Sequence, residues 1–119
     1  MYPRHTLIAD LLNAPERIQA IEASLIRAAQ AHQNAKDEVR DLEADLLQQT
    51  NADGKPFPID GKNEAIRSAQ LREHTLPLAL AVRETEVTLS AARASLAYEQ
   101  NRFAALRTVA GLLGPEVTL

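Results

Sequence analysis

Apolar residues recur every three or four positions along two long stretches of the chain. In the first stretch these positions are Leu7, Leu11, Ala14, Ile18, Ile21, Leu25, Ala28, His32, Ala35, Val39, Leu42 and Leu46. In the second, the positions with this spacing are Leu78, Val82, Thr85, Leu89, Ala92, Leu96, Glu99, Phe103, Leu106, Ala110 and Leu113. Glu99 breaks the second apolar run and His32 softens the first, but neither changes the spacing. We call the two sets the first and the second seam. A repeat of about 3.5 residues over several heptads is typical of coiled-coil helices, so the pattern predicts an all-α protein.

The sequence predicts a single domain over residues 1–119. We expect a short helix over 5–12, a long helix over 14–49, a loop over 50–62 and a second long helix over 63–113. Asn13 is expected to cap the first long helix, because Pro15 fits its first turn. Two Asp-Gly steps and two prolines make a regular element improbable in the loop. Asp60 or Asn63 is expected to cap the second long helix.

Pro77 lies inside the second long helix and predicts a kink near residues 74–76, because its ring removes one helical hydrogen bond. The loop permits the second helix to return antiparallel to the first. The expected fold is therefore an elongated antiparallel helical hairpin, a two-helix coiled coil. An alignment with Leu25 beside Leu89 and Ile18 beside Leu96 fits this hairpin.

The later helix carries further apolar residues on the side away from its seam. We call the following positions the outer stripe: Leu80, Val87, Ala91, Ala94, Tyr98 and Leu112. Ala105 follows the same spacing. One interpretation is that its alanines only favour helix on a solvated surface. The other, which we prefer, is a protein interface, because a helix that is apolar on two faces is usually buried on two faces.

Two occupants fit such an interface. A symmetric homodimer that forms a four-helix bundle would cover the outer stripe, and an unidentified protein target would do the same. Phe57 and Ile59 at the loop tip are a second contact candidate, since loops often carry recognition residues. The alternative for Phe57 is that it folds onto the end of the hairpin.

Composition narrows the function classes. The chain has 13 basic and 16 acidic residues, so no global positive field attracts nucleic acid. Cysteine is absent, which excludes disulfides, thiolate metal sites and a cysteine nucleophile. No apolar stretch reaches the roughly 18 residues of a membrane span. Asp10 interrupts the apolar opening, which therefore does not resemble a secretory signal, and we expect a cytoplasmic protein.

Known chemical motifs fit the chain poorly. Six residues separate Gly54 from Gly61, where a phosphate-binding loop has four, and Asn63 stands where that loop needs Ser or Thr. A calcium loop through Asn51, Asp53 and Asp60 would lack its bidentate glutamate. The three histidines, His5, His32 and His74, lack the spacing of paired zinc ligands. We therefore predict no catalytic residue, cofactor or metal, and a non-enzymatic protein.

Nucleic acid is an alternative partner that we do not favour, because the basic residues of the later helix do not form a clear stripe. Four arginines of the later helix alternate with glutamates and do not share one face: Arg83, Arg93, Arg102 and Arg107. An acidic cluster on the first long helix is typical of a solvated face: Asp37, Glu38, Asp41, Glu43 and Asp45.

The segment from Asp60 to Leu71, DGKNEAIRSAQL, resembles a connection found in small phage and prophage coiled-coil proteins. Those chains also have two long helices around such a connection, and some are similar to accessory proteins encoded near phage recombination genes. The resemblance implies a bacterial or phage origin. We expect a protein–protein interaction module that serves as adaptor, inhibitor or assembly factor. The alternatives are an accessory nucleic-acid-binding protein of phage recombination or replication, and a structural component of a particle.

Overall fold

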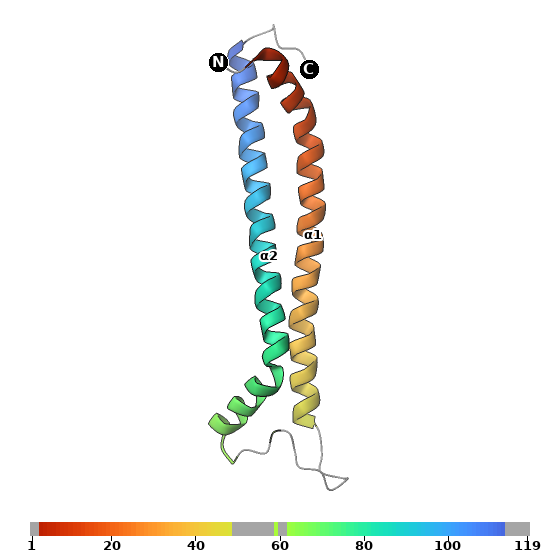
Figure 1. The fold of residues 1–119 in the computed structure, drawn as a ribbon, viewed down its shortest axis with the longest axis vertical. Helices are drawn as coiled ribbons and strands as arrows, with labels where there is room; N and C mark the ends of the chain where they lie inside the picture. Colours follow the sequence, from red (N-terminus) through yellow and green to blue (C-terminus); the bar gives the residue numbers. More distant parts are fainter. Residues whose placement is uncertain (1–2, 49–58, 60–61, 114–119) are drawn as a thin grey trace. The chain divides into compact units, whose positions relative to one another are not determined.

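The computed structural model describes residues 3–48, 59 and 62–113. Helix α1 spans Arg4–Gln48 and helix α2 spans Glu64–Leu113 (Figure 1). The described residues contain no strand, so the predicted all-α class is confirmed for this part of the chain. Most of the predicted loop lies outside the described residues.

The chain divides into two compact units, each with a segment of both helices. Unit 1 comprises Met1–Ala28 and Thr88–Leu119, and unit 2 comprises Ala29–Val87. Within each unit the segments of α1 and α2 lie side by side and run in opposite directions (Figure 1). The antiparallel pairing of two long helices is therefore as predicted, whereas the single domain and the four-helix bundle stay predictions.

The two seams supply nearly all buried side chains of the described residues. Every position of the first seam is buried or half-buried, and so is every position of the second except Leu113, the last residue of α2. In unit 1, Leu7, Leu11 and Leu106 form a core cluster. Phe103 and Ala110 pack against this cluster. Full burial of one leucine contributes about 1.5–3 kcal/mol, so this cluster is a main source of stability in unit 1.

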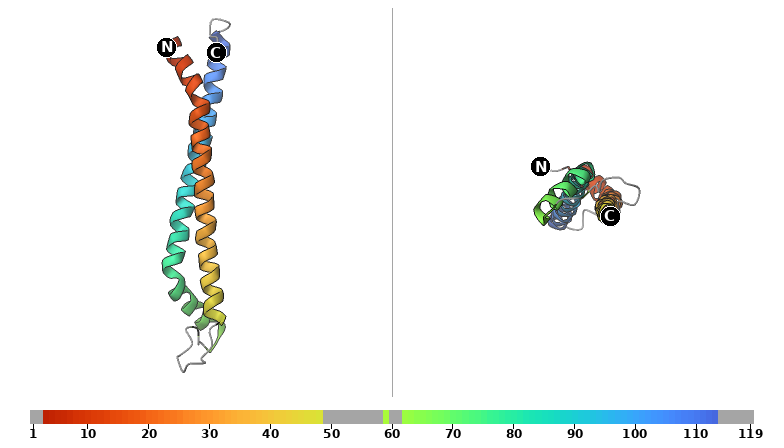
Figure 2. Two further views of the ribbon diagram at one scale, coloured as in Figure 1. Left: turned by 90° about the vertical axis from the view of Figure 1, so that its right-hand side faces the viewer. Right: turned by 90° about the horizontal axis from the view of Figure 1, so that it is seen from below.

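The beginning of α1 differs from the prediction. One continuous helix begins at Arg4, where the sequence predicted a short helix over 5–12 and a new helix capped by Asn13. Pro15 lies inside α1 and removes one helical hydrogen bond, a cost of about 3 kcal/mol. Leu7, Leu11 and Ala14 are buried on one side of this segment and offset that cost. The helix bends in its first turns and continues (Figure 2).

Helix α2 begins directly after Asn63, one of the two predicted N-cap residues. The Asn63 side-chain oxygen accepts a hydrogen bond of 2.9 Å from the backbone N–H of Ile66. Its carbonyl oxygen accepts one of 3.1 Å from the N–H of Arg67. Asn63 is therefore the N-cap, and the negative charge of Glu64 suits the first turn. Asp60, the other predicted cap, lies outside the described residues.

Helix α2 passes through Pro77 without interruption, but its first turns are inclined to those that follow (Figure 1, light green). Proline removes the N–H that would bond the carbonyl of Glu73. Just before it, the Thr75 hydroxyl donates a hydrogen bond of 2.8 Å to the carbonyl of Leu71. Such a bond from Thr to the preceding turn also bends helices. Both residues therefore favour a bend in this part of α2.

Polar residues lie at and beside the seam positions. In unit 1, Glu99 lies 3.6 Å from Arg17, and Arg102 lies 3.2 Å from Asp10. These pairs agree with the predicted alignment of Ile18 with Leu96 to within one helical turn.

In unit 2, the ring nitrogen Nδ1 of His32 lies 3.0 Å from the hydroxyl of Thr85. That hydroxyl is also within hydrogen-bond distance of the carbonyls of Ala81 and Val82. With its single proton directed to the helix, the Thr85 oxygen accepts from Nδ1–H of His32. The predicted alignment, continued, would place His32 opposite Val82. The observed partner is three residues further along α2, which is also within one helical turn of the predicted alignment.

Candidate protein interface

The outer stripe is exposed in both units. In unit 2, Leu80 is 51% and Val87 is 65% exposed. In unit 1, Tyr98 is 65% and Leu112 is 82% exposed, and the two alanines of the stripe, Ala91 and Ala94, are exposed as well. The side of α2 predicted for the stripe therefore faces away from the seam in each unit. Its role as a contact surface stays a prediction.

In unit 1, mostly small residues border the stripe on α2. One border consists of Ser90, Ala97, Ala104 and Gly111, all of them exposed, and the other consists of the exposed Ser95 and Val109 with the half-buried Arg102 between them. Together with Ala91, Ala94, Tyr98, Asn101, Ala105, Thr108 and Leu112, these residues form a surface that we call the outer face of unit 1. A side chain at Gly111 would meet no atom of the chain within 4 Å of its Cβ. A neighbouring helix would therefore be able to approach this face closely.

Several exposed apolar residues were missed from the sequence. On α1, Leu12, Ile26 and Leu47 are 61%, 70% and 59% exposed. They are separated by multiples of seven residues, so they occupy one heptad position, and this spacing was the signal that could have identified them. On α2, Val109 is 36% exposed beside the outer stripe in unit 1. The exposed apolar surface of α1 is sparser, because Gln19, Gln33 and Arg40 fill the intervening places.

The loop-tip contact is only partly described. Ile59 is half-buried, and Phe57 lies outside the described residues, as do the calcium-loop candidates Asn51, Asp53 and Asp60. The exposure of every residue is therefore known for the outer stripe but not for the loop tip.

Two of the four arginines considered as a nucleic-acid surface interact with the chain itself. Arg102 forms the ion pair with Asp10, and both side chains are largely buried, at 32% and 20% exposure. The guanidinium carbon of Arg107 lies 5.8 Å from the ring centroid of Phe103, a cation–π distance. Engaged cations are less available to phosphates, so these contacts weaken the case for a basic binding surface on α2.

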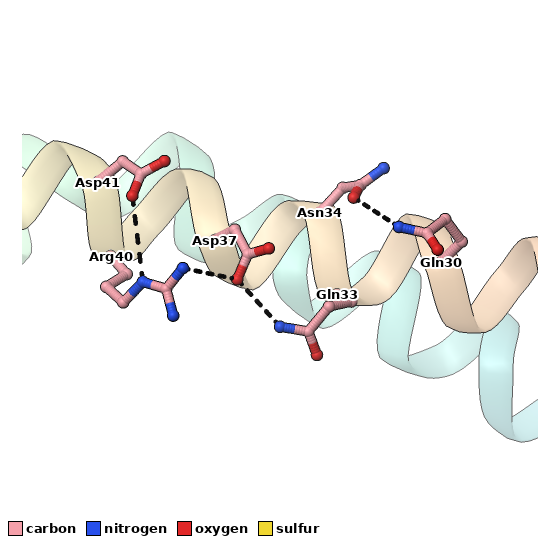
Figure 3. Close-up of polar contacts among 6 residues, drawn as sticks. All are labelled: Gln30, Gln33, Asn34, Asp37, Arg40 and Asp41. Carbon is pink, nitrogen blue, oxygen red and sulfur yellow. Dashed lines mark hydrogen bonds and ion pairs between the residues drawn. The ribbon is translucent and has the colours of Figure 1, made fainter.

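Polar contacts on α1 in unit 2 agree with a solvated face (Figure 3). Gln30 donates to Asn34 and Gln33 donates to Asp37, each at 2.9 Å. Asp37 also lies 3.1 Å from Arg40 in an ion pair one turn further along. Exposed contacts of this kind stabilise a helix by only about 0.2–0.5 kcal/mol each. Residues of the acidic cluster thus have local partners along their own helix.

The surface has open hollows among the described residues. One of about 220 Å³ in unit 2 is mainly apolar and is lined by Lys36, Val39, Ala79 and Val82. Two others in unit 1 have volumes of about 320 and 430 Å³. Within the described ranges, no three residues of the types His, Cys, Asp and Glu gather as metal ligands.

In each unit, the packing of the two helices leaves the outer-stripe residues of α2 exposed. Among residues 3–48, 59 and 62–113, neither helix has a segment with the length and apolar character needed to cross a bilayer. Comparison with protein-family models, curated proteins and solved structures gives no match to this chain.

Proposed function

We propose that the chain is a non-enzymatic protein-interaction module, an adaptor, inhibitor or assembly factor of the cytoplasm, and that the outer stripe is its binding surface. The observation that carries the proposal is the exposure of Leu80, Val87, Tyr98 and Leu112 in units whose seams are already filled. Large apolar surfaces are seldom left in water by soluble proteins unless they serve an interaction.

The physical gain comes from removing these side chains from water. Burial of a leucine or valine side chain contributes about 1.5–3 kcal/mol, so Leu80 and Val87 in unit 2, and separately Tyr98 and Leu112 in unit 1, each offer an apolar contact. Alanine between them allows a partner helix to approach closely. The complementary partner is thus an apolar helical surface, either on a second copy of the chain or on another protein.

Substitution of Val87 tests this function. Val87→Glu places a carboxylate on the outer stripe, and Ala44→Glu places the same group on an exposed position of α1. Each tagged variant is co-expressed with untagged wild type in the native cell and captured, and bound proteins are identified by mass spectrometry. We expect Val87→Glu to lose partners that Ala44→Glu and wild type retain, with equal helicity by circular dichroism. Identical sets of bound proteins, the untagged copy included, would contradict the proposed function.

A further inference from the structure

We propose that the outer side of α2 in unit 2 binds the same surface of a second copy of the chain, with the two α2 segments antiparallel. This inference rests on the proposed function and names the partner of the outer stripe in unit 2. Leu76, Leu80 and Val87 are each more than half exposed, so their burial favours association. The surface, which we call the outer face of unit 2, consists of six exposed residues at steps of three and four: Ala69, Glu73, Leu76, Leu80, Arg83 and Val87.

The outer face of unit 2 contains two charged residues, Glu73 and Arg83, which have opposite signs. Each lies three residues outside the central leucines, Glu73 before Leu76 and Arg83 after Leu80. Within the part of the chain that the structure describes, neither charged side chain makes an ion pair or a hydrogen bond. A partner that covers the leucines therefore needs a base opposite Glu73 and an acid opposite Arg83, because an unpaired charge at a contact is strongly unfavourable.

A second copy of this face supplies both charges when it runs in the opposite direction. A two-fold axis level with residue 78 places Glu73 opposite Arg83 of the second copy, and Leu76 opposite Leu80 of the second copy. Symmetry repeats both contacts on the other side of the axis. A parallel pair in register would place Glu73 against Glu73 and Arg83 against Arg83, and like charges at a contact repel. An antiparallel pair shifted by a heptad would separate both charge pairs, so the charges select one alignment.

Further charged residues border this face and fit the same alignment. Arg72 and Glu86 lie along one edge, are exposed, and make no ion pair among the described residues. In the antiparallel pair, Arg72 lies near Glu86 of the second copy. Glu84 lies along the other edge and has an interaction within its own chain. Each end of the contact thus joins two arginines, Arg72 of one copy and Arg83 of the other, with three carboxylates.

The ends of the face combine a small side chain with a larger one. Ala69 lies opposite Val87 of the second copy, each seven residues from the nearer of its two partners' central leucines. The first turns of α2 incline away from α1, and therefore toward this face (Figure 1, light green). They lean toward the second copy, where the small side chain of Ala69 leaves room for Val87.

Charge reversal tests the pairing of Glu73 with Arg83. Sedimentation equilibrium at low salt should show a concentration-dependent dimer for wild type. Glu73→Arg and Arg83→Glu should each weaken self-association at least about tenfold, because each places like charges opposite each other twice. A mixture of the two variants should form a heterodimer about as tightly as wild type forms its dimer, since opposite charges again face each other.

Arg93→Glu is the matched control, because it makes the same charge change at an exposed position of α2 off this face. It should dimerise like wild type, and all variants should keep the circular dichroism of wild type. Equal dimerisation of wild type and both single variants of the outer face would overturn the proposal. A mixture of those two variants that stays monomeric while wild type dimerises would overturn it as well.

Cysteine substitutions test the direction of the two helices, because the chain has no native cysteine. With a short bis-maleimide linker, Ala69→Cys should link to Val87→Cys when the two variants are mixed. Ala69→Cys should not link to itself, since the two copies of residue 69 lie at opposite ends of the contact. Self-linking of Ala69→Cys without the mixed product would indicate a parallel pair and overturn the antiparallel one.

The remaining outcomes separate this inference from the proposed function. A monomeric wild type whose photo-reactive substitution at Leu80 captures a different protein would refute the second copy and leave the interaction module standing. A monomeric wild type that captures nothing at Leu80, Val87 or Tyr98 would refute both.

Discussion

Replacement of Glu99 by leucine should stabilise the protein, although it breaks an ion pair. Glu99 occupies a seam position and is 17% exposed, while its partner Arg17 is 40% exposed. The two charged groups are 3.6 Å apart, and neither Glu99 Oε2 nor Arg17 Nε makes a hydrogen bond. The pair therefore combines a partly desolvated carboxylate with an attraction that lacks hydrogen-bond geometry.

The magnitude follows from comparing two contributions. At an effective dielectric constant of about 20, charges at this distance attract by about 4–5 kcal/mol, but desolvation and screening reduce the net value of partly exposed pairs to about 0–1 kcal/mol. A leucine at the same seam position gains about 1.5–2 kcal/mol from burial. The Arg17 side chain is 40% exposed, so its buried Nε and Nη2 have to turn toward water when the carboxylate is removed, and this rearrangement reduces the gain. The expected net increase in the free energy of unfolding is about 1 kcal/mol.

Urea unfolding followed by far-ultraviolet circular dichroism, at one protein concentration, measures this change. Glu99→Gln removes the charge and keeps the shape, and we expect it to lie within about 0.5 kcal/mol of wild type. Glu86→Leu places the same leucine at an exposed position of α2 and should also change little. A loss of more than about 1 kcal/mol in Glu99→Leu would refute the reasoning, since the ion pair would then outweigh apolar burial.

Three further substitutions test the packing, the cap and the bend. Leu106→Ala should lower the free energy of unfolding by about 2–4 kcal/mol because it opens a cavity in the core cluster, whereas Leu80→Ala should cost under about 1 kcal/mol; equal losses in urea unfolding would contradict this assignment. Asn63→Ala should lose about 1 kcal/mol by removing the N-cap, and Asn63→Asp should keep it; equal melting temperatures of all three proteins would argue against the cap. Pro77→Ala should raise the helical signal and the melting temperature by restoring a backbone hydrogen bond, and a lower melting temperature would indicate that packing in unit 2 depends on the bend.

The seams could be predicted because burial repeats with the helix. A side chain faces the neighbouring helix about every 3.5 residues. Even the polar seam residues His32, Thr85 and Glu99 are therefore half-buried, as the pattern predicted. The same period would have placed Thr75 in the second seam, three residues before Leu78, and the structure buries it. It was missed because Pro77 suggested that the regular pattern began only after the kink.

Local signals predicted the helix ends less well. Asn13 and Pro15 form a good start for a helix by themselves, yet α1 runs through both residues. The reason is tertiary: continuity aligns Leu7 and Leu11 with Leu106, and this burial outweighs one lost hydrogen bond. No residue near position 13 indicates from the sequence that this burial against Leu106 is available. At Asn63 the local signal and the packing agree, and the predicted cap is present.

The outer stripe could be located from spacing alone, but its borders could not be judged without side-chain exposure. Alanine is common on any helix, so Ala91 and Ala94 did not distinguish a solvated surface from a contact surface. The structure adds the open space at Gly111 and the ion pair that holds Arg102 beside Asp10. Together these show that the face is open at Gly111 and that Arg102, which lies between Ser95 and Val109 in the heptad, has a counter-charge on α1.

The two ion pairs of unit 1 favour one alignment of α1 with α2 over shifted alignments during folding. A repeating seam tolerates sliding, because every turn offers similar apolar contacts. Here the acid lies on α1 in one pair and on α2 in the other. Sliding α2 by three residues in one direction would bring Asp10 opposite Glu99, and sliding it in the other would bring Arg17 opposite Arg102. Either shift places like charges next to each other, which raises the free energy of the shifted pairing of unit 1 above that of the native one.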